Sequence, residues 1–483
     1  MVSRMRKRFQ GGGLAGALLW AALAAAQAPE SDLQALGLED AIAQALDHNR
    51  DLVKGALDLQ GYRLDEQRAR EAARGIQIVP EGTVGTGPEG GNWRAGLRAE
   101  ATGAYGTRVA AGTAVQQIEV DAGTDNRRGE VRVEISQPLF RQFGPLVQNE
   151  PIVVANETLQ AARRAWERDR SALVVRVVEL YEGLIYLRQQ IERDEAFAAR
   201  LERLWALADV REKQGKATRT EVLRMDLQRG EAESRLETGR SQLAIQFQTF
   251  ADLLGLPLDS AFRLIPPVLL DLEVEESGRA LAVAVAERPD YAQALQDIET
   301  SARQERLARR SLLPDLTLGA RRTAYGEGEE WSDAGRLDQD DWFVGLTADM
   351  NVNLRGARLD VARSGLDAEA SRQVAEIVRN RLALEVNSAL SAYRRTRAEL
   401  HLAERNRELA AQRAELARVL FGAGRASADS VSDAEADGIE AELAELAARR
   451  EASVSAYRLL HVLGTLVPAP RELLPKEQRK DDA

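Results

Sequence analysis

The sequence predicts a mostly α-helical chain with a smaller β-sheet, in which one unit of long helical hairpins plus two β-strands occurs twice. Good helix formers such as Ala, Leu, Glu and Arg dominate the composition, whereas aromatic residues make up only 5% of the 483 residues. Two long windows contain no proline and repeat hydrophobic residues with helical spacing. Two shorter regions alternate hydrophobic and polar residues, which is typical of strands.

The composition excludes several classes of function. The chain has no cysteine, so disulfides, thiolate metal sites and a cysteine nucleophile are excluded. Its three histidines, His48, His401 and His461, are far apart in the sequence. The net charge of -11 disfavours nucleic-acid binding, which needs a basic surface. We therefore expect a protein that is not an enzyme and has no metal site, cofactor or nucleic-acid partner.

The first residues have the three parts of a secretory signal peptide. Basic residues between Arg4 and Arg8 precede a short apolar stretch, and small residues at Ala24 and Ala26 fit a cleavage site. The apolar stretch is shorter than the ~20 residues that a transmembrane helix needs. The sequence thus predicts a signal peptide over residues 1–26, and no hydrophobic helix that would hold the mature chain in a membrane.

Short motifs recur in the same order in both halves of the mature chain, which indicates an internal duplication. Gly215-Lys-Ala-Thr-Arg-Thr-Glu-Val222 is similar to Gly424-Arg-Ala-Ser-Ala-Asp-Ser-Val431, and Leu254-Gly255 recurs as Leu463-Gly464 at the same offset. The predicted boundaries are residues 27–257 for the first repeat, 258–276 for a linker, 277–467 for the second repeat and 468–483 for a polar C-terminal tail.

Each repeat is predicted to end in a long helical hairpin. Apolar residues step by alternating intervals of four and three along the first helix of each hairpin, as they do where helices pack along their length. These seam residues are Leu173, Val177, Leu180, Leu184, Leu187 and Ile191 in the first repeat and Leu382, Val386, Ala389, Tyr393, Thr396 and Leu400 in the second. Glycine ends both helices, so the hairpin tips are predicted near residues 215 and 424.

The β segments are predicted at about residues 93–137 and 315–352. In the second segment, residues 342–352 place apolar and polar side chains on opposite sides. The pattern suits a lipid-facing barrel strand, although a half-buried soluble sheet has the same period. Residues 97–120 also have a strand pattern, interrupted by Gly103, Gly106 and Gly112, and fit one strand or two, so the number of strands in the first β segment stays open. Two strands per repeat give about four per chain. Residues 85–90 match GxGxxG, but no helix is expected to follow them, so we interpret them as a flexible connector.

Four strands are too few to close a barrel. In lipid, the open edges would leave backbone groups unpaired at a cost of several kcal/mol each, so we expect several copies to close the sheet together. The pattern alone allows two, three or four copies. Trp342, Trp331 and Trp93 are candidates for anchoring at the membrane–water boundary, with ordinary strand packing as the alternative.

Four features lie in a fixed order within the duplicated frame. They are Leu-Glu-Asp-Ala at residues 38–41, Gln137-Pro-Leu-Phe140 after the first β segment, the glycine tips followed by Val222 and Val431, and Leu253-Leu-Gly-Leu-Pro257. Together they resemble the TolC-type outer-membrane efflux proteins, or outer membrane factors, over about residues 36–467.

That resemblance implies a homotrimer in which a 12-stranded β-barrel in outer-membrane lipid continues into a periplasmic α-helical barrel. It implies a passive exit duct of a tripartite efflux or type I secretion system, gated at the periplasmic helical tips and without a catalytic site. The expected partners are a periplasmic adaptor (membrane fusion protein) and an inner-membrane pump. The expected location is the cell outer membrane, extending into the periplasm. Drugs, metal ions and polypeptides are equally compatible substrates.

The resemblance also assigns roles to the tips. The adaptor-docking residues are expected to be Gly215, Lys216, Ala217, Thr218, Gly424, Arg425, Ala426 and Ser427. The periplasmic aperture is expected to involve Asp433, Asp429, Ser430 and Glu221, although Ser430 stands where the family has an acidic residue. Copies of Asp433 around a narrow axis would favour cations. The alternatives are a solvated residue or helix cap for Asp433, and plain surface charges for Lys216 and Arg425.

Two other functions fit part of the pattern. A soluble periplasmic coiled-coil structural spacer with a small capping sheet would account for the helices. An envelope hydrolase is disfavoured, because the sequence offers no nucleophile–base pair and no metal-ligand cluster.

Overall fold

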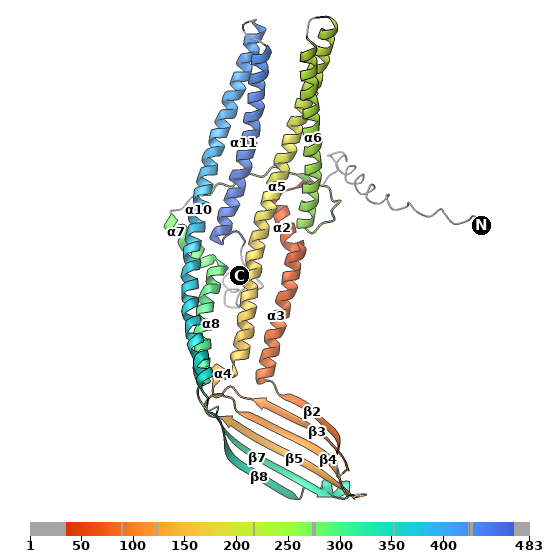
Figure 1. The fold of residues 1–483 in the computed structure, drawn as a ribbon, viewed down its shortest axis with the longest axis vertical. Helices are drawn as coiled ribbons and strands as arrows, with labels where there is room; N and C mark the ends of the chain where they lie inside the picture. Colours follow the sequence, from red (N-terminus) through yellow and green to blue (C-terminus); the bar gives the residue numbers. More distant parts are fainter. Residues whose placement is uncertain are drawn as a thin grey trace, which may run out of the picture. The chain divides into compact units, whose positions relative to one another are not determined.

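The computed structural model describes residues 35–87, 90–121, 124–215, 218–272, 277–350, 353–423, 425 and 428–467 (Figure 1). The predicted signal peptide and the predicted C-terminal tail lie outside the described residues. Two compact units divide the chain. The helical unit comprises Met1–Gly55, Trp166–Pro289 and Asn380–Ala483, and the sheet unit comprises Ala56–Ala165 and Asp290–Arg379.

The two halves of the chain follow the same order of elements: a short helix, a second helix, strands, a very long helix and a return helix. The first half contains α2 (Leu38–His48), α3 (Arg50–Arg74), β2 (Gln77–Gly87), β3 (Gly90–Thr102), β4 (Arg108–Asp121), β5 (Thr124–Pro138), α4 (Pro145–Gln148), α5 (Glu150–Lys213) and α6 (Arg219–Leu253). The second half contains α7 (Ser277–Glu287), α8 (Pro289–Arg310), β7 (Asp315–Gly328), α9 (Trp331–Ala334), β8 (Gln339–Asp349), α10 (Arg355–Gly422) and α11 (Ala428–Leu463).

The long helices form where the sequence predicts them. α5 has 64 residues and α10 has 68, and neither contains proline beyond its first turn. The predicted seam residues are buried, except Leu180 and Ala389, which are half-buried. The helices are therefore held by tertiary packing of one narrow face and not by propensity alone. Among the helices of the described residues, none is both long and apolar enough to cross a membrane.

The core of the helical unit lies where α5 meets α2 and the end of α6. Tyr181 and Phe250 are fully buried, and their rings lie 6.0 Å apart in an edge-on arrangement. Gly255 ends the return helix with a φ of 73°, and a Cβ there would lie 2.1 Å from the carbonyl oxygen of His48. Gly464 has a φ of 79° and packs in the same way on Glu287, so both repeats close their helical end through a glycine contact.

The linker between the repeats is tied to both long helices. Its short strand β6 (Arg263–Leu264) pairs in parallel with β1 (Ala35–Leu36). The hydroxyl of Tyr181 lies 2.8 Å from the carbonyl oxygen of Leu36 and accepts a hydrogen bond of 3.1 Å from the backbone N–H of Ile265. Further along, the N–H of Leu272 donates to the hydroxyl of Tyr393 on α10 at 2.9 Å. The linker is thus hydrogen-bonded to α5 at one end and to α10 at the other.

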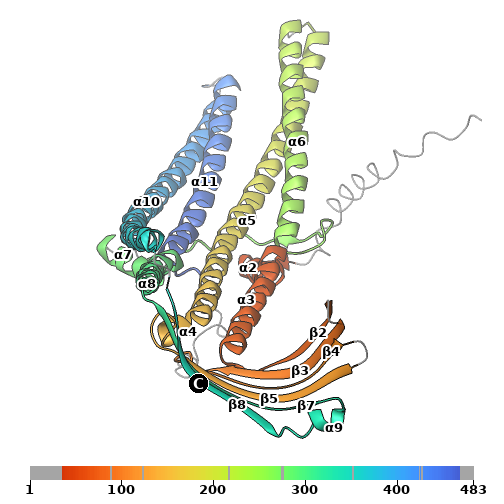
Figure 2. The same cartoon turned by 60° about the horizontal axis from the view of Figure 1, so that its bottom comes forward.

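The sheet unit contains one antiparallel sheet with the strand order β2-β3-β4-β5-β7-β8 (Figures 1 and 2). The prediction of two strands per repeat is wrong for the first repeat, which supplies four strands. The β segment predicted from residue 93 begins instead at Gln77. Residues 85–87 of the GxGxxG run belong to β2 and residue 90 to β3, so these four residues are in strands and not in a flexible connector. The glycines of β2 obscured its strand pattern, and pairing with β3 stabilises it.

Burial of Glu182 on α5 predicts a pH-dependent stability. The side chain is 6% exposed, and burial raises the pKa of its carboxyl group, an effect that Ser453, Arg449 and Arg450 partly oppose. A raised pKa means that the folded state holds its proton to higher pH than the unfolded state does. The contribution of this group to stability therefore falls as the pH rises from the ordinary carboxyl range through the raised value.

We expect Glu182→Gln to increase the free energy of unfolding at neutral pH and to leave it unchanged in acid, where both states are protonated. Denaturant unfolding followed by circular dichroism from about pH 4 to about pH 8 measures this difference. Glu192→Gln, on the exposed side of the same helix, is the matched control. An increase in the free energy of unfolding for Glu182→Gln that is the same at every pH would contradict the explanation by a raised pKa.

Candidate functional site: the sheet faces and the helical tips

The strand register sorts the side chains of the sheet onto two faces. One face is apolar along all six strands. Its larger side chains are Ile78 and Val84 from β2, Trp93 and Leu97 from β3, Val109 and Val115 from β4, Val131, Val133 and Ile135 from β5, Leu316 and Leu318 from β7, and Trp342, Val344 and Leu346 from β8. Val84 is 90% exposed and Trp342 is 72% exposed. An apolar face of this extent needs a partner or lipid to cover it.

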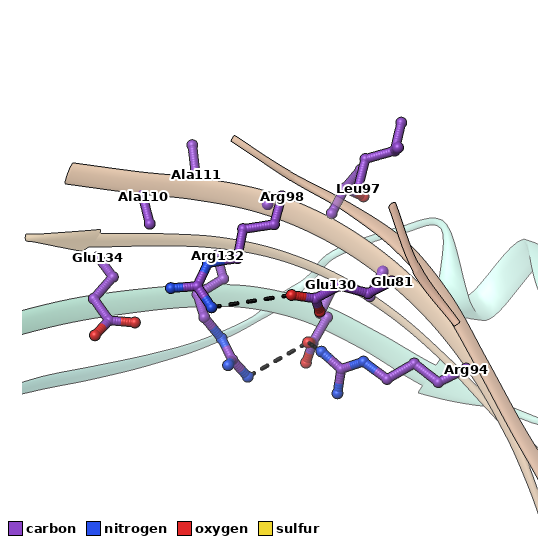
Figure 3. Close-up of a pocket in the computed structure, with 12 residues that line it drawn as sticks. Glu81, Arg94, Leu97, Arg98, Ala110, Ala111, Glu130, Arg132 and Glu134 are labelled. Carbon is purple, nitrogen blue, oxygen red and sulfur yellow. Dashed lines mark hydrogen bonds and ion pairs between the residues drawn. The ribbon is translucent and has the colours of Figure 1, made fainter. Parts of the chain in front are cut away.

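The opposite face carries charged side chains around a hollow (Figure 3). The floor is formed by Ala110, Gly112 and Ala114 of β4, whose small side chains leave room between the charged residues of β3 and β5. Figure 3 shows the side chains of Arg94 and Arg132 directed toward Glu130, with which both form ion pairs. The two faces therefore differ as the outer and inner walls of a water-filled barrel do.

Glu130 is the centre of an ion network on this face. The side chain is only 7% exposed, and its carboxylate pairs with Arg94, with Arg132 at 3.4 Å and with Arg128 at 3.8 Å. Arg94 lies on β3 and Glu130 on β5, so their ion pair crosses β4 where that strand has small residues. Several guanidinium groups compensate the desolvation of one carboxylate, and the network ties non-adjacent strands together.

The three tryptophans predicted at the membrane–water boundary lie toward the end of the sheet where β2 connects to β3, β4 to β5 and β7 to β8. Trp93 and Trp331 contact one another, with ring centroids 5.6 Å apart, although Trp331 lies on α9 and not on a strand. α9 packs on the apolar face, where the carbonyl oxygen of Ala334 approaches Gly129. Trp342 lies next to an ion pair of Arg322 with Asp340 at 3.1 Å, which limits the apolar band on this side. This combination is typical of a membrane–water interface.

A second aromatic group lies at the opposite end of the sheet, where the strands join the helices. Tyr105, in the turn between β3 and β4, has its ring centroid 5.8 Å from that of Phe143, and Phe140 follows the end of β5. All three are exposed. These three residues were not among the predicted boundary anchors. The sequence signal that could have identified them as boundary anchors is their position in non-strand segments next to the apolar strands.

The described tip residues have the geometry of tight helical turns. Gly215 follows α5 with a φ of 69°, and the N–H of Val222 donates to the carbonyl oxygen of Thr218 at 3.4 Å as α6 begins. Arg425 is exposed. The other predicted docking residues, Lys216, Ala217, Gly424, Ala426 and Ser427, lie outside the described residues.

The predicted aperture residues lie in the first turns of the return helices. Glu221 belongs to α6, and Asp429, Ser430 and Asp433 belong to α11. The side chains of Glu221, Asp429 and Ser430 lie outside the described part of the structure, whereas that of Asp433 is exposed. Exposure of Asp433 suits both a channel lining and a solvated surface, so its aperture role stays a prediction.

Polar contacts join the two hairpins within the helical unit. Arg200 on α5 contacts Glu435 on α11 at 2.6 Å, and Arg193 contacts Glu442 at 2.9 Å. These side chains are 25–50% exposed, so each pair contributes less than about 1 kcal/mol. Further from the tips, the hydroxyl of Ser171 lies 2.7 Å from Nδ1 of His461. These two ion pairs therefore add little to the contact between the hairpins toward the tips.

Among the described residues, no group of three or more His, Asp or Glu side chains is placed to hold an ion. His401 is 90% exposed beside Glu404, and His48 contacts the backbone of its own helix.

Replacing the buried carboxylate of the ion network should weaken the sheet unit. We expect Glu130→Ala to lower the free energy of unfolding in detergent by about 2 kcal/mol, because three guanidinium groups lose their shared counter-charge. Glu327→Ala should lower the free energy of unfolding by less than about 1 kcal/mol, because the Glu327 side chain is 39% exposed and lies 3.8 Å from Arg128. Equal effects of the two substitutions, measured by urea titration, would contradict a central role for Glu130.

No protein-family profile matches the sequence. No curated protein is detectably similar to it. Solved structures do share its fold. The outer-membrane channel OprN has 17% sequence identity and a TM-score of 0.68 over 89% of this chain and 90% of that chain. The outer membrane protein VceC of Vibrio cholerae has 18% identity and a TM-score of 0.66 over 88% and 96%.

The CmeC outer membrane channel of Campylobacter jejuni has 12% identity and a TM-score of 0.67 over 89% of this chain and 86% of that chain. At these identities the likeness establishes the fold. The helical hairpins predicted from the hydrophobic spacing are confirmed, the predicted strand number is wrong for the first repeat, and this chain has the fold of solved outer-membrane channel proteins.

Proposed function

We propose that this chain is the subunit of a passive exit duct in the cell outer membrane, extending into the periplasm. The observation that carries the proposal is the sheet with one continuous apolar face and one charged face. Val84 and Trp342, at its two outer strands, are among the most exposed large apolar side chains of the described residues. Lipid covers such a face without any protein partner, while the charged face lines water.

The edges of the sheet support assembly from several copies. Among the described strands, β2 and β8 each have a partner on one side only. In lipid every unpaired N–H or C=O costs several kcal/mol, so a subunit of this kind closes its sheet against other copies. Three copies are favoured by the resemblance to TolC-type efflux proteins, and the likeness to solved outer-membrane channels agrees with it.

The remaining parts have roles in a tripartite efflux or type I secretion system. The helices form the periplasmic section, and the tips around Gly215 and Arg425 contact a periplasmic adaptor (membrane fusion protein), which receives substrate from an inner-membrane pump. The weak ion pairs between the hairpins suit a gate that opens at the tips. The duct itself needs no cofactor, because the pump supplies the energy.

The alternative of a soluble periplasmic coiled-coil spacer accounts for the helices but not for the sheet. A soluble capping sheet would cover its apolar face, whereas Leu346 is 59% exposed and Leu97 is 55% exposed.

The two faces give a direct test through adjacent residues of β8. Leu346 lies on the apolar face and Thr347 on the charged face, and both are exposed. An arginine on a lipid-facing strand costs about 2–4 kcal/mol at mid-membrane depth. We expect Leu346→Arg to reduce the detergent-stable trimer in outer-membrane fractions by about tenfold or more. Thr347→Arg should leave it nearly unchanged.

Membrane fractionation followed by semi-native gels measures both variants and the parent chain. A parent chain released by osmotic shock as a dissolved monomer would end the proposal and favour the spacer.

The aperture role of Asp433 has a separate test. Removal of several carboxylates from a narrow axis weakens cation trapping and widens the passage, so Asp433→Ala should raise single-channel conductance in planar bilayers and lower cation selectivity. Glu440→Ala, on the same side of α11 but two turns further from the tip, should change neither quantity. An unchanged current for Asp433→Ala removes this residue from the aperture.

A further inference from the structure

The first half of the chain contains one more β-hairpin than the second half. Between α8 and α10, one hairpin of β7 and β8 leaves the helices and returns to them. Between α3 and α5, the chain leaves and returns twice, through β2 and β3 and then through β4 and β5. In the described residues, therefore, two strands of the first repeat have no counterpart in the second.

The additional strands are integrated into the sheet. β2 pairs with β3 from Gln77 opposite Glu100 to Gly87 opposite Gly90, and β3 pairs with β4 from Asn92 opposite Ile118 to Thr102 opposite Arg108. No register shift occurs in either pairing, whereas β4 and β5 have one near their turn. A hairpin paired along its whole length forms part of the same wall as the other strands.

The additional strands also have the two faces of that wall. Ile78 and Val84 of β2 are exposed on the apolar face. On the opposite face, Glu81 of β2 lies 4.0 Å from Arg98 of β3, and Arg94 of β3 reaches Glu130 of β5. The charged network therefore continues across the additional hairpin. A hairpin folded away from the barrel would have no use for a lipid-facing side and a water-facing side.

We propose that β2 is the subunit edge that pairs with β8 of the next copy, so that three copies form an eighteen-stranded barrel and not a twelve-stranded one. This inference rests on the proposed function. The chain direction allows the pairing, because β2 runs away from the helices and β8 runs back toward them, which makes their contact antiparallel like every other contact in the sheet.

The strand number fixes the width of the barrel. With strands about 4.8 Å apart and tilted by about 40°, twelve strands give a backbone diameter of about 24 Å, and eighteen give about 36 Å. The cross-section of the barrel lumen is then roughly doubled. The outer section of the duct would therefore admit bulkier cargo than a twelve-stranded barrel, and its width would not limit the flow.

The absence of cysteine from the chain makes the proposal testable by cross-linking. Pairs of cysteines are introduced on the charged face, with one in β8 at Asp341, Gly345 or Thr347 and the other in β2 at Val79 or Thr83. The matched control pairs the same β8 positions with Ala110 or Ala114 of β4. Outer membranes are treated with a short bis-maleimide, and the products are separated on denaturing gels.

We expect ladders of two and three linked subunits for at least one β2–β8 pair and none for the β4–β8 pairs. Linkage of β4 to β8 without linkage of β2 would overturn the eighteen-stranded barrel while leaving the duct intact. Failure of every pair would overturn both, because the sheet would not close between copies.

Direct imaging supplies a second measurement that needs no variant. Single-particle images of the detergent-extracted assembly should show three subunits and eighteen strands. Two subunits with twelve strands, or three subunits with the β2–β3 hairpin outside the wall, would overturn the proposal.

Discussion

On the proposed function, the requirement that every backbone N–H and C=O group be paired in lipid accounts for the form of the sheet unit. Within one chain the requirement is met for the four inner strands, which pair on both sides, and is left unmet at the outer edges of β2 and β8. The two repeats contain different numbers of hairpins. This difference does not affect pairing of the outer strands between copies, because a hairpin adds two strands and preserves the antiparallel order. A duplicated chain can therefore gain a hairpin in one repeat without losing its ability to close with identical copies.

The charged face follows from a second requirement, which is that water-facing charges be neutralised without filling the interior. β4 supplies Ala110, Gly112 and Ala114 at the positions between charged neighbours. The small residues let Arg94 of β3 reach Glu130 of β5, so opposite charges meet above β4.

The sequence was informative where a single period governed a long stretch. The seam from Leu173 to Ile191 and its counterpart from Leu382 to Leu400 were found because a helix of this length repeats its contact many times. β2 was missed because three glycines and Pro80 interrupt its alternation, and its strand form depends on β3. The contact of Trp93 with Trp331 joins segments far apart in the chain, which no local pattern reveals. The tip residues were recognised by resemblance, and their roles stay predictions.

The attachment of the linker at both ends has a mechanical consequence. Residue Ile265 is fastened to α5 through Tyr181, and Leu272 is fastened to α10 through Tyr393, so the chain between these anchors spans at most about 25 Å. While both hydrogen bonds hold, α5 and α10 stay within that distance of one another at the level of the linker. With these bonds intact, the hairpins can move apart more at their tips than beside the linker.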